Sequence, residues 1–224
     1  MPKNTFVILC LSAFLCVGTT QTINANTNSR PDIERDVARF NDDFSGKAIS
    51  SWRWKTNSVP VMLSNGVAQF RSTSNLFPYI STQANPFPET QKFSVEFGFR
   101  YRSVADRGTG MVVHQFAPSP GDPPYYGTNW QFQVWQDTIR PLQIYFNGNV
   151  IYQSSSLDLN AHIAKWVRTD MDRVYLDNTL IYTTAIAMVN PKAIWIGNFA
   201  DDVTPGAWSS FDMDFVRVLR LDNK

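Results

Sequence analysis

The most regular feature of the chain is an alternation of apolar and polar positions. In "KFSVEFGFRYRS" (92–103), the apolar residues from Phe93 to Tyr101 take every second position. A period of two is typical of a β-strand that buries one face. The same alternation recurs in the segments 110–116, 130–136, 193–199 and 209–222. No long stretch has a helical period, so the sequence predicts an all-β domain.

Turn-forming dipeptides lie between the alternating segments. Hairpin signals occur at Asn65-Gly66, Asn147-Gly148 and Asp177-Asn178. Such pairs favour tight hairpin loops, because Asn, Asp and Gly tolerate the positive φ that these loops require. Many short strands joined by turns predict a β-sandwich, a jelly roll of two antiparallel sheets. A closed barrel is the alternative architecture.

The first residues have the pattern of a targeting segment. Lys3 precedes "FVILCLSAFLCVG" (6–18), an apolar run of signal-peptide length that is too short to span a bilayer. We expect residues 1–25 to be a signal peptide, residues 26–39 a polar lead-in and residues 40–224 a single domain. A retained membrane anchor is the alternative for the apolar run. Cleavage would give a secreted protein, extracellular or periplasmic, without membrane contact.

Composition narrows the chemistry of the mature protein. Both cysteines, Cys10 and Cys16, lie inside the predicted signal peptide, so we expect no disulfide and no thiol chemistry. With two histidines and no mature cysteine, a zinc cluster of the usual kind is excluded. The formal net charge is +1 and no Lys/Arg cluster occurs, so the sequence predicts no nucleic-acid partner. Aromatic residues make up 14% of the chain, enough to leave aromatic surface for a ligand.

Taken in order, several segments resemble the concanavalin A-like lectin/glucanase jelly rolls. These segments are "DDFSG" (42–46), "FSVEFGFRYRSVADRGTG" (93–110), "WVRTDMDRVYLDNTLIYT" (166–183) and "WSSFDMDFVRVLRL" (208–221). Within that superfamily the chain is most similar to family-16 glycoside hydrolases of the laminarinase/lichenase type. The resemblance covers about residues 40–222. It implies the fold more strongly than the activity, because one fold hosts many functions.

The resemblance gives a meaning to three glutamines. Family-16 hydrolases carry E-x-D-x-x-E or E-x-D-x-E on a strand that lines the cleft. The corresponding strand here holds Gln131, Gln133 and Gln136, so the spacing of the longer motif is kept and every acid has become an amide. A neutral amide is neither the carboxylate nucleophile nor the acid/base that retaining hydrolysis needs. It can still hydrogen-bond to sugar hydroxyls. An ordinary exposed strand face is the alternative interpretation.

These observations predict a secreted carbohydrate-binding protein without retaining hydrolase chemistry. The predicted partner is an oligo- or polysaccharide. The glutamines would form a hydrogen-bonding floor, and aromatic platforms would come from Tyr125, Tyr126, Trp130 and Trp208.

Two other functions stay open on the same fold. The chain could be an active glycan-degrading enzyme, either a hydrolase with displaced carboxylates or a polysaccharide lyase that uses His114 and Tyr145. A buried structural role is the alternative for His114. The chain could also be a structural or adhesive surface domain with no sugar ligand.

No cofactor is expected, but the resemblance implies that a structural calcium ion could bind. Asp214 matches an aspartate that binds calcium in some family members, together with backbone carbonyls near a hairpin glycine, here Gly66. One carboxylate with carbonyl oxygens is a small ligand set.

Overall fold

The structure is a computed structural model. It describes residues 37–57, 59–71, 78–88, 92–104, 109–115, 130–186, 189–198 and 210–221. These residues belong to one compact unit, residues 34–224. They form fifteen strands, every pairing between them is antiparallel, and the described part of the chain has no apolar helix of membrane-spanning length.

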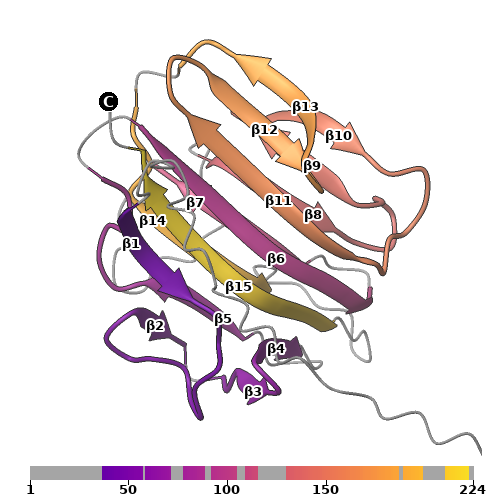
Figure 1. Cartoon of the computed structure of the whole chain (residues 1–224). Coiled ribbons are helices and arrows are strands. Elements are labelled where there is room, and N and C mark those ends of the chain that lie inside the picture. The colour runs from indigo at the N-terminus through magenta and orange to yellow at the C-terminus, as the bar shows by residue number, and fades with distance from the viewer. Residues whose placement is uncertain are drawn as a thin grey trace, which may run out of the picture. The chain divides into compact units, whose positions relative to one another are not determined.

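One sheet has eight strands. Its order is β13 (Thr179–Thr184), β12 (Asp172–Leu176), β11 (Ala161–Arg168), β6 (Phe93–Ser103), β15 (Ser210–Arg220), β4 (Val67–Arg71) and β3 (Met62–Ser64), with β1 (Val37–Asp42) also paired to β15. This sheet faces the viewer in Figure 1. Strand β1 begins three residues before the domain start expected at residue 40, because Val37 already pairs with Arg220.

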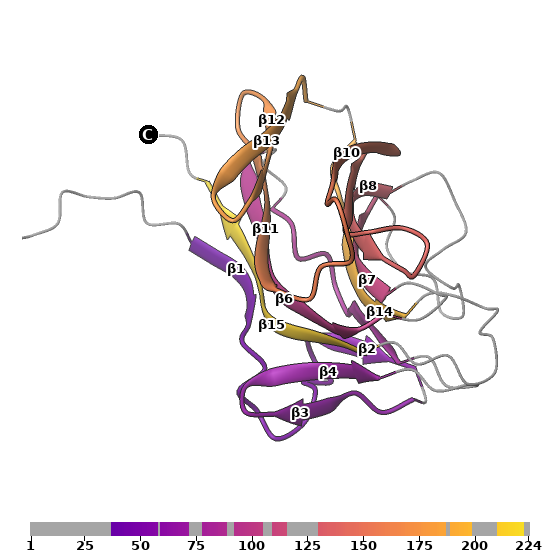
Figure 2. The ribbon, with the colours of Figure 1, turned by 90° about the vertical axis from the view of Figure 1, so that its right-hand side faces the viewer.

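The second sheet has seven strands. Its order is β10 (Asn149–Gln153), β9 (Gln143–Phe146), β8 (Trp130–Gln136), β7 (Thr109–His114), β14 (Ala193–Asn198), β5 (Tyr79–Thr82) and β2 (Trp54–Thr56). Figure 2 shows the two sheets face to face, with β6, β11 and β15 in one layer and β7, β8 and β14 in the other. The predicted all-β sandwich of two antiparallel sheets is therefore confirmed.

The core lies between the sheets and is largely aromatic. The rings of Phe97 and Phe132 stack at 6.0 Å, and Phe146 meets Trp166 edge-on at 5.2 Å. Each of these side chains belongs to the apolar half of an alternating strand, so the period of two decides which residues are buried. The other half of each strand faces outward and is available for a ligand.

The predicted turns are confirmed by the backbone. Asn65, Asn147, Asp177 and Asn178 have φ of 54°, 48°, 50° and 65°, and Gly66 and Gly148 are also at positive φ. Each pair joins two adjacent strands of one sheet, as expected of hairpins.

A buried ion pair closes one end of the β11–β12 hairpin. Arg168 and Asp172 are both fully buried, and Arg168 Nε donates to Asp172 Oδ1 at 2.7 Å. Trp166 Nε1 also donates to this carboxylate oxygen. Arg168 Nη1 then reaches the backbone oxygen of Val189 at 3.3 Å, in the connection between β13 and β14. The pair thereby links the eight-stranded sheet to a segment that leads into the other sheet.

Candidate functional site

The three predicted glutamines all lie on β8, but the pairing of β8 decides where their side chains point. From Phe132 to Gln136 the strand pairs with β7 without interruption, and Gln131 is the extra residue of a bulge before Phe132. Phe132 and Val134 belong to the inter-sheet core. Alternation therefore places Gln133 and Trp135 on the outer face of the seven-stranded sheet and turns Gln136 away from it.

Gln136 departs from the expectation that the three amides share one face. Its side chain is fully buried, Nε2 donates to the backbone oxygen of Asp158 at 2.8 Å, and Oε1 accepts from the backbone N–H of Asp158 at 2.7 Å. Both polar ends of the amide therefore hold the connection between β10 and β11. The physical reason is the position of the bulge, which precedes Phe132 instead of lying between Gln133 and Gln136.

The side chain of Gln131 also binds a loop. It is only 1% exposed, and its Nε2 donates to the backbone oxygen of Val189, the same oxygen that Arg168 contacts. Its Oε1 is buried and has no hydrogen-bond partner in the part of the chain that the structure describes. Gln131 thus fixes the β13–β14 connection at the end of β8, with one acceptor left unused.

Gln133 belongs to a row of seven residues that crosses the whole outer face. Register places one residue of each strand side by side, in the order Val150, Tyr145, Gln133, Val112, Trp195, Ser81 and Lys55. A neighbouring row contains Gln153, Gln143, Trp135, Gly110, Gly197 and Tyr79. We call the rings and amides of these two rows the amide–aromatic face: Tyr79, Gln133, Trp135, Gln143, Tyr145, Gln153 and Trp195.

The rings of this face pack together outside the main core. Val112, Ala193 and Trp195 form a separate apolar cluster, against which Tyr79, Trp130 and Trp135 pack. The rings of Tyr79 and Trp195 are 5.8 Å apart. Trp195 is 5% exposed, and its Nε1 has no hydrogen-bond partner among the described residues. A buried N–H without a partner is costly, so this donor suits a ligand acceptor.

The amides of the face form a chain across β9 and β10. Tyr145 Oη donates to Gln143 Oε1, and Gln143 Nε2 donates to Gln153 Oε1 at 2.7 Å. The side-chain amide of Gln133, beside them, makes no hydrogen bond with any described residue, although Gln133 is only 5% exposed. The face thus combines rings with side chains that can both donate and accept.

Sequence reasoning missed five members of the face: Tyr79, Trp135, Gln143, Gln153 and Trp195. For Gln143 and Trp195 the sequence did contain a signal, the alternation with buried residues. Gln143 alternates with the buried Ile144, and Trp195 alternates with the buried Ile194 and Ile196. Which outer residues come together depends on the strand order β8–β9 and β7–β14, and alternation within one strand does not contain that order.

Among the remaining predicted site residues, some lie on the outer face and others lie outside the described residues. Trp130 begins β8 and packs on the outer cluster. Tyr125, Tyr126 and Trp208 lie outside the described residues. His114 is half-buried and pairs with Ala193, which places it on the same outer face as Tyr145. Strand β8 lies between His114 and Tyr145, so two strand spacings, about 9–10 Å, separate their strands.

A carboxylate contacts the described face beside its two rows: Asp137 Oδ2 accepts from Trp135 Nε1 at 3.3 Å and also from Arg140 Nε at 2.8 Å. Neither row contains an Asp or Glu. Glu96 alternates with the buried residues of β6 and pairs with Lys165 at 2.7 Å and Arg217 at 3.6 Å, so it belongs to the outer face of the other sheet. Retaining hydrolysis needs two carboxyl groups about 5–5.5 Å apart, and the described rows supply neither.

The predicted calcium ligands lie near the outer face of the eight-stranded sheet. Asp214 is exposed and is the bulged residue of β15 between Met213 and Phe215, and Gly66 lies in the β3–β4 turn. Among the described residues, no group of three or more His, Cys, Asp or Glu side chains could hold a metal ion. Oxygen ligands suit calcium, so the ion would depend on one carboxylate and on backbone carbonyls.

Comparisons with known proteins identify the fold of this chain. No family model matches the sequence, and no curated protein matches it significantly. The catalytic domain of an endo-1,3-beta-glucanase (laminarinase) from Thermotoga petrophila RKU-1 matches with a TM-score of 0.60 at 12% identity, over 85% of this chain and 100% of that chain. The carbohydrate recognition domain of Emp47p matches with a TM-score of 0.62 at 15% identity, over 85% and 99%. The fold is the concanavalin A-like jelly roll.

A third matching structure is a polysaccharide lyase with the same jelly-roll fold. The alginate lyase AlgAT5 of polysaccharide lyase family 7 matches with a TM-score of 0.55 at 10% identity, over 75% of this chain and 94% of that chain. The resemblance inferred from the sequence is confirmed at the level of the concanavalin A-like fold. At these identities the likeness fixes the fold alone, and function must be argued from the site.

Proposed function

We propose that the amide–aromatic face binds an oligo- or polysaccharide. The observation that carries this proposal is the pair of adjacent rows in which aromatic rings lie beside side-chain amides and which contain no Asp or Glu. Apolar faces of sugar rings pack on aromatic side chains, and amides satisfy both donors and acceptors of hydroxyl groups. Gln133 and the indole N–H of Trp195 supply hydrogen-bonding atoms that have no partner in the described protein.

The length of the face favours a chain of sugars over a single terminal sugar. The Gln133 row crosses seven strands. Six spacings of about 4.8 Å give a row of roughly 29 Å. A single monosaccharide would cover only a fraction of that length.

We infer further that this face binds without retaining hydrolysis. Gln133 stands where the family-16 resemblance expects a carboxylate, and the described rows hold no acid to replace it. Losing general acid/base help alone costs typically about 10²–10⁴-fold in rate. We also propose that residues 1–25 direct export, so that binding takes place outside the cytoplasm.

Affinity electrophoresis tests the binding proposal. The mature chain, residues 26–224, is run through gels that contain laminarin, lichenan or alginate. We expect retardation by at least one polymer and a clear loss of retardation in Gln133→Ala and Trp195→Phe. Gln69→Ala is the matched control, since Gln69 lies on β4 of the other sheet and should change nothing. Equal retardation of all four proteins would place binding elsewhere.

A second candidate function is polysaccharide lysis. It is favoured by one observation, the presence of His114 and Tyr145 on the same outer face as Gln133. A lyase needs a base and a group that neutralises the uronate, and these side chains have suitable chemistry. Incubation with alginate would then release unsaturated uronates that absorb in the ultraviolet, and Tyr145→Phe would abolish the release. If alginate retards the protein but no unsaturated product is released, the function is binding and not lysis.

A further inference from the structure

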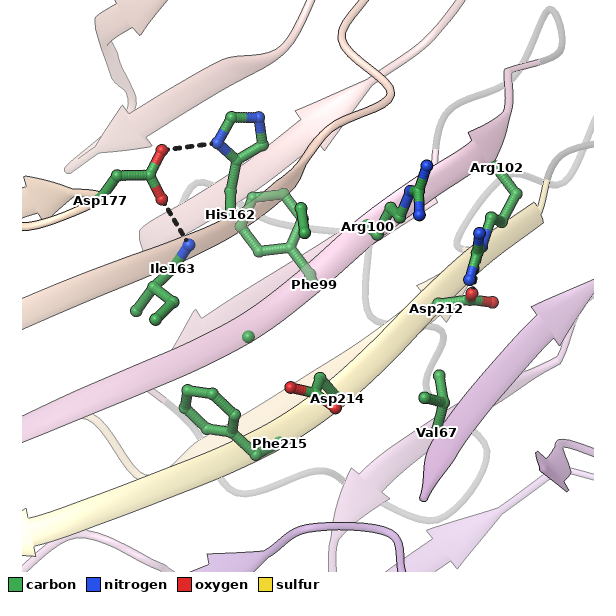
Figure 3. Close-up of a pocket in the computed structure, with 12 residues that line it drawn as sticks. Val67, Phe99, Arg100, Arg102, His162, Ile163, Asp177, Asp212, Asp214 and Phe215 are labelled. Carbon is green, nitrogen blue, oxygen red and sulfur yellow. Dashed lines mark hydrogen bonds and ion pairs between the residues drawn. The ribbon is translucent and has the colours of Figure 1, made fainter. Parts of the chain in front are cut away.

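A hollow of about 460 Å³ lies on the outer face of the eight-stranded sheet, on the opposite side of the sandwich from the amide–aromatic face. Figure 3 shows it between β6, β11, β15 and β4. Its volume falls within the range of about 300–1,000 Å³ that is usual for small-molecule sites. The saccharide binding proposed for the amide–aromatic face does not involve this outer face of the eight-stranded sheet.

Two small residues create the hollow. Gly98 on β6 pairs with Ile163 on one side and with Phe215 on the other. A Cβ at position 98 would lie 2.5 Å from Phe215 Cε1, so the missing side chain lets the Phe215 ring lie low against β6. In the next row, Ala161 stands beside Arg100. The result is an apolar floor that larger side chains at positions 98 and 161 would fill.

Oriented polar groups stand around this floor. Arg100 Nε donates to the backbone oxygen of Leu159 at 3.0 Å, which fixes the guanidinium, and its two terminal nitrogens have no partner among the described residues. Across from it, Asp212 Oδ2 accepts from Arg102 Nε at 2.5 Å. Figure 3 shows these three side chains along one side of the hollow. Donors and acceptors therefore lie together at one edge of an apolar surface.

The charges around the hollow nearly cancel. Two arginines, Arg100 and Arg102, face three aspartates, Asp177, Asp212 and Asp214. A strongly anionic or cationic ligand would gain little from such a lining, because attraction to one sign is offset by repulsion from the other. A neutral molecule with several hydroxyl groups and an apolar face meets all three features: the floor, the donors and the acceptors.

We propose that this hollow is a second saccharide site, which binds a neutral mono- or disaccharide independently of the amide–aromatic face. The sugar's apolar face lies on Gly98, Ile163 and Phe215. Its hydroxyl groups bind the free guanidinium nitrogens of Arg100 and the carboxylate of Asp212. The chain then presents saccharide sites on both outer faces of the sandwich.

Backbone amide signals in NMR locate binding on one face or the other. The ¹⁵N-labelled mature chain is titrated with cellobiose, laminaribiose and lactose into the millimolar range. We expect saturable shifts of the Gly98, Ile163 and Phe215 amides with at least one sugar. The same shifts should persist in Trp195→Phe, a change on the opposite face. Shifts confined to the amide–aromatic face, or none with any of the sugars, would overturn the second site and leave the first proposal standing.

Two variants test the hollow itself. Ala161→Leu should fill it, and Arg100→Gln should remove charge-assisted hydrogen bonds worth about 1.5–3 kcal/mol, a loss in affinity of tenfold or more. Ala48→Leu and Arg173→Gln are the matched controls, because Ala48 is exposed away from the hollow and Arg173 pairs with Asp170. Unchanged affinity in both hollow variants would refute the proposal, even if one of them folded poorly.

Discussion

Two glutamines of one strand, Gln133 and Gln136, have opposite roles although only two residues separate them. The Gln136 side chain satisfies both backbone groups of Asp158, whereas the side-chain amide of Gln133 makes no hydrogen bond with a described residue. We predict that Gln136→Ala lowers the free energy of unfolding by about 2 kcal/mol, because it leaves buried backbone groups unpaired. Gln133→Ala should cost little stability and instead weaken saccharide binding. Urea unfolding of both variants measures the difference, and equal losses would contradict it.

His162 gives the domain a pH-dependent contact. Its Nδ1 lies 2.7 Å from Asp177 Oδ2, and its Nε2 lies 3.2 Å from Asp158 Oδ2. Burial by itself lowers the pKa of His162, but the two carboxylates outweigh burial and hold this pKa above its ordinary value of 6.5. For Asp158, burial raises the pKa, but the Asn160 backbone N–H and His162 outweigh it and lower this pKa below 3.8.

The two shifts set the sign of the pH dependence. The raised pKa of His162 stabilises the fold fully below about pH 6.5, and this contribution is lost as pH rises through the folded-state pKa. The lowered pKa of Asp158 adds stability that is lost only in acid. We predict a higher urea midpoint near pH 6 than near pH 8, by at most about 1 kcal/mol for a partly exposed pair. His162→Gln should remove the difference, while His114→Gln should keep it.

At the level of elements, Gly110 allows strands β7 and β8 of the site to approach each other closely. Gly110 on β7 stands between Trp135 and Gly197 in the second row of the face. A Cβ at Gly110 would lie 1.9 Å from the backbone oxygen of Val134 on β8. Because that neighbour is backbone, Gly110→Ala must push the two strands apart. We predict a loss of about 3 kcal/mol in unfolding free energy, with the exposed Gly46→Ala as a control near zero. A Gly110→Ala protein as stable as the parent would disprove the close approach.

The same strands show how far the sequence determines the site. Alternation was enough to predict the buried face of β6, and the Asn-Gly and Asp-Asn pairs were enough to predict the hairpins. In β15 a bulge at Asp214 shifts the alternation, so that Met213 and Val216 are both buried. The bulge at Gln131 was not predictable, because it depends on where His114 of β7 pairs with β8. Because this bulge precedes Phe132, the pairing from Gln133 to Gln136 is uninterrupted, and the two side chains therefore lie on opposite faces of the sheet. Tyr79 and Trp195 join the face only through the order β7–β14–β5, which no local pattern contains.

At the scale of the whole molecule, the sandwich separates two chemically different outer faces. One face combines rings and amides from five strands of the seven-stranded sheet, and the other has a hollow with balanced charges beside the Glu96 ion pairs. The aromatic core between them joins both sheets, so a change on one face should leave binding on the other intact. Variants more than about 7–10 Å apart with no shared partners usually have additive effects.

Calcium would act on the whole molecule, because its predicted ligands join the two ends of the domain. Asp214 lies on the last strand and Gly66 in the β3–β4 turn near the start, and β4 pairs with β15. An ion bound there would stabilise only the folded chain. At calcium a hundredfold above Kd the gain is about 2.7 kcal/mol, a rise in Tm of roughly 5–10 °C. We predict that a chelator lowers Tm by this amount, that Asp214→Asn abolishes the response, and that Asp170→Asn on an exposed turn keeps it. If Tm is the same with calcium and with chelator, Asp214 binds no structural ion and the β4–β15 pairing is stable by itself.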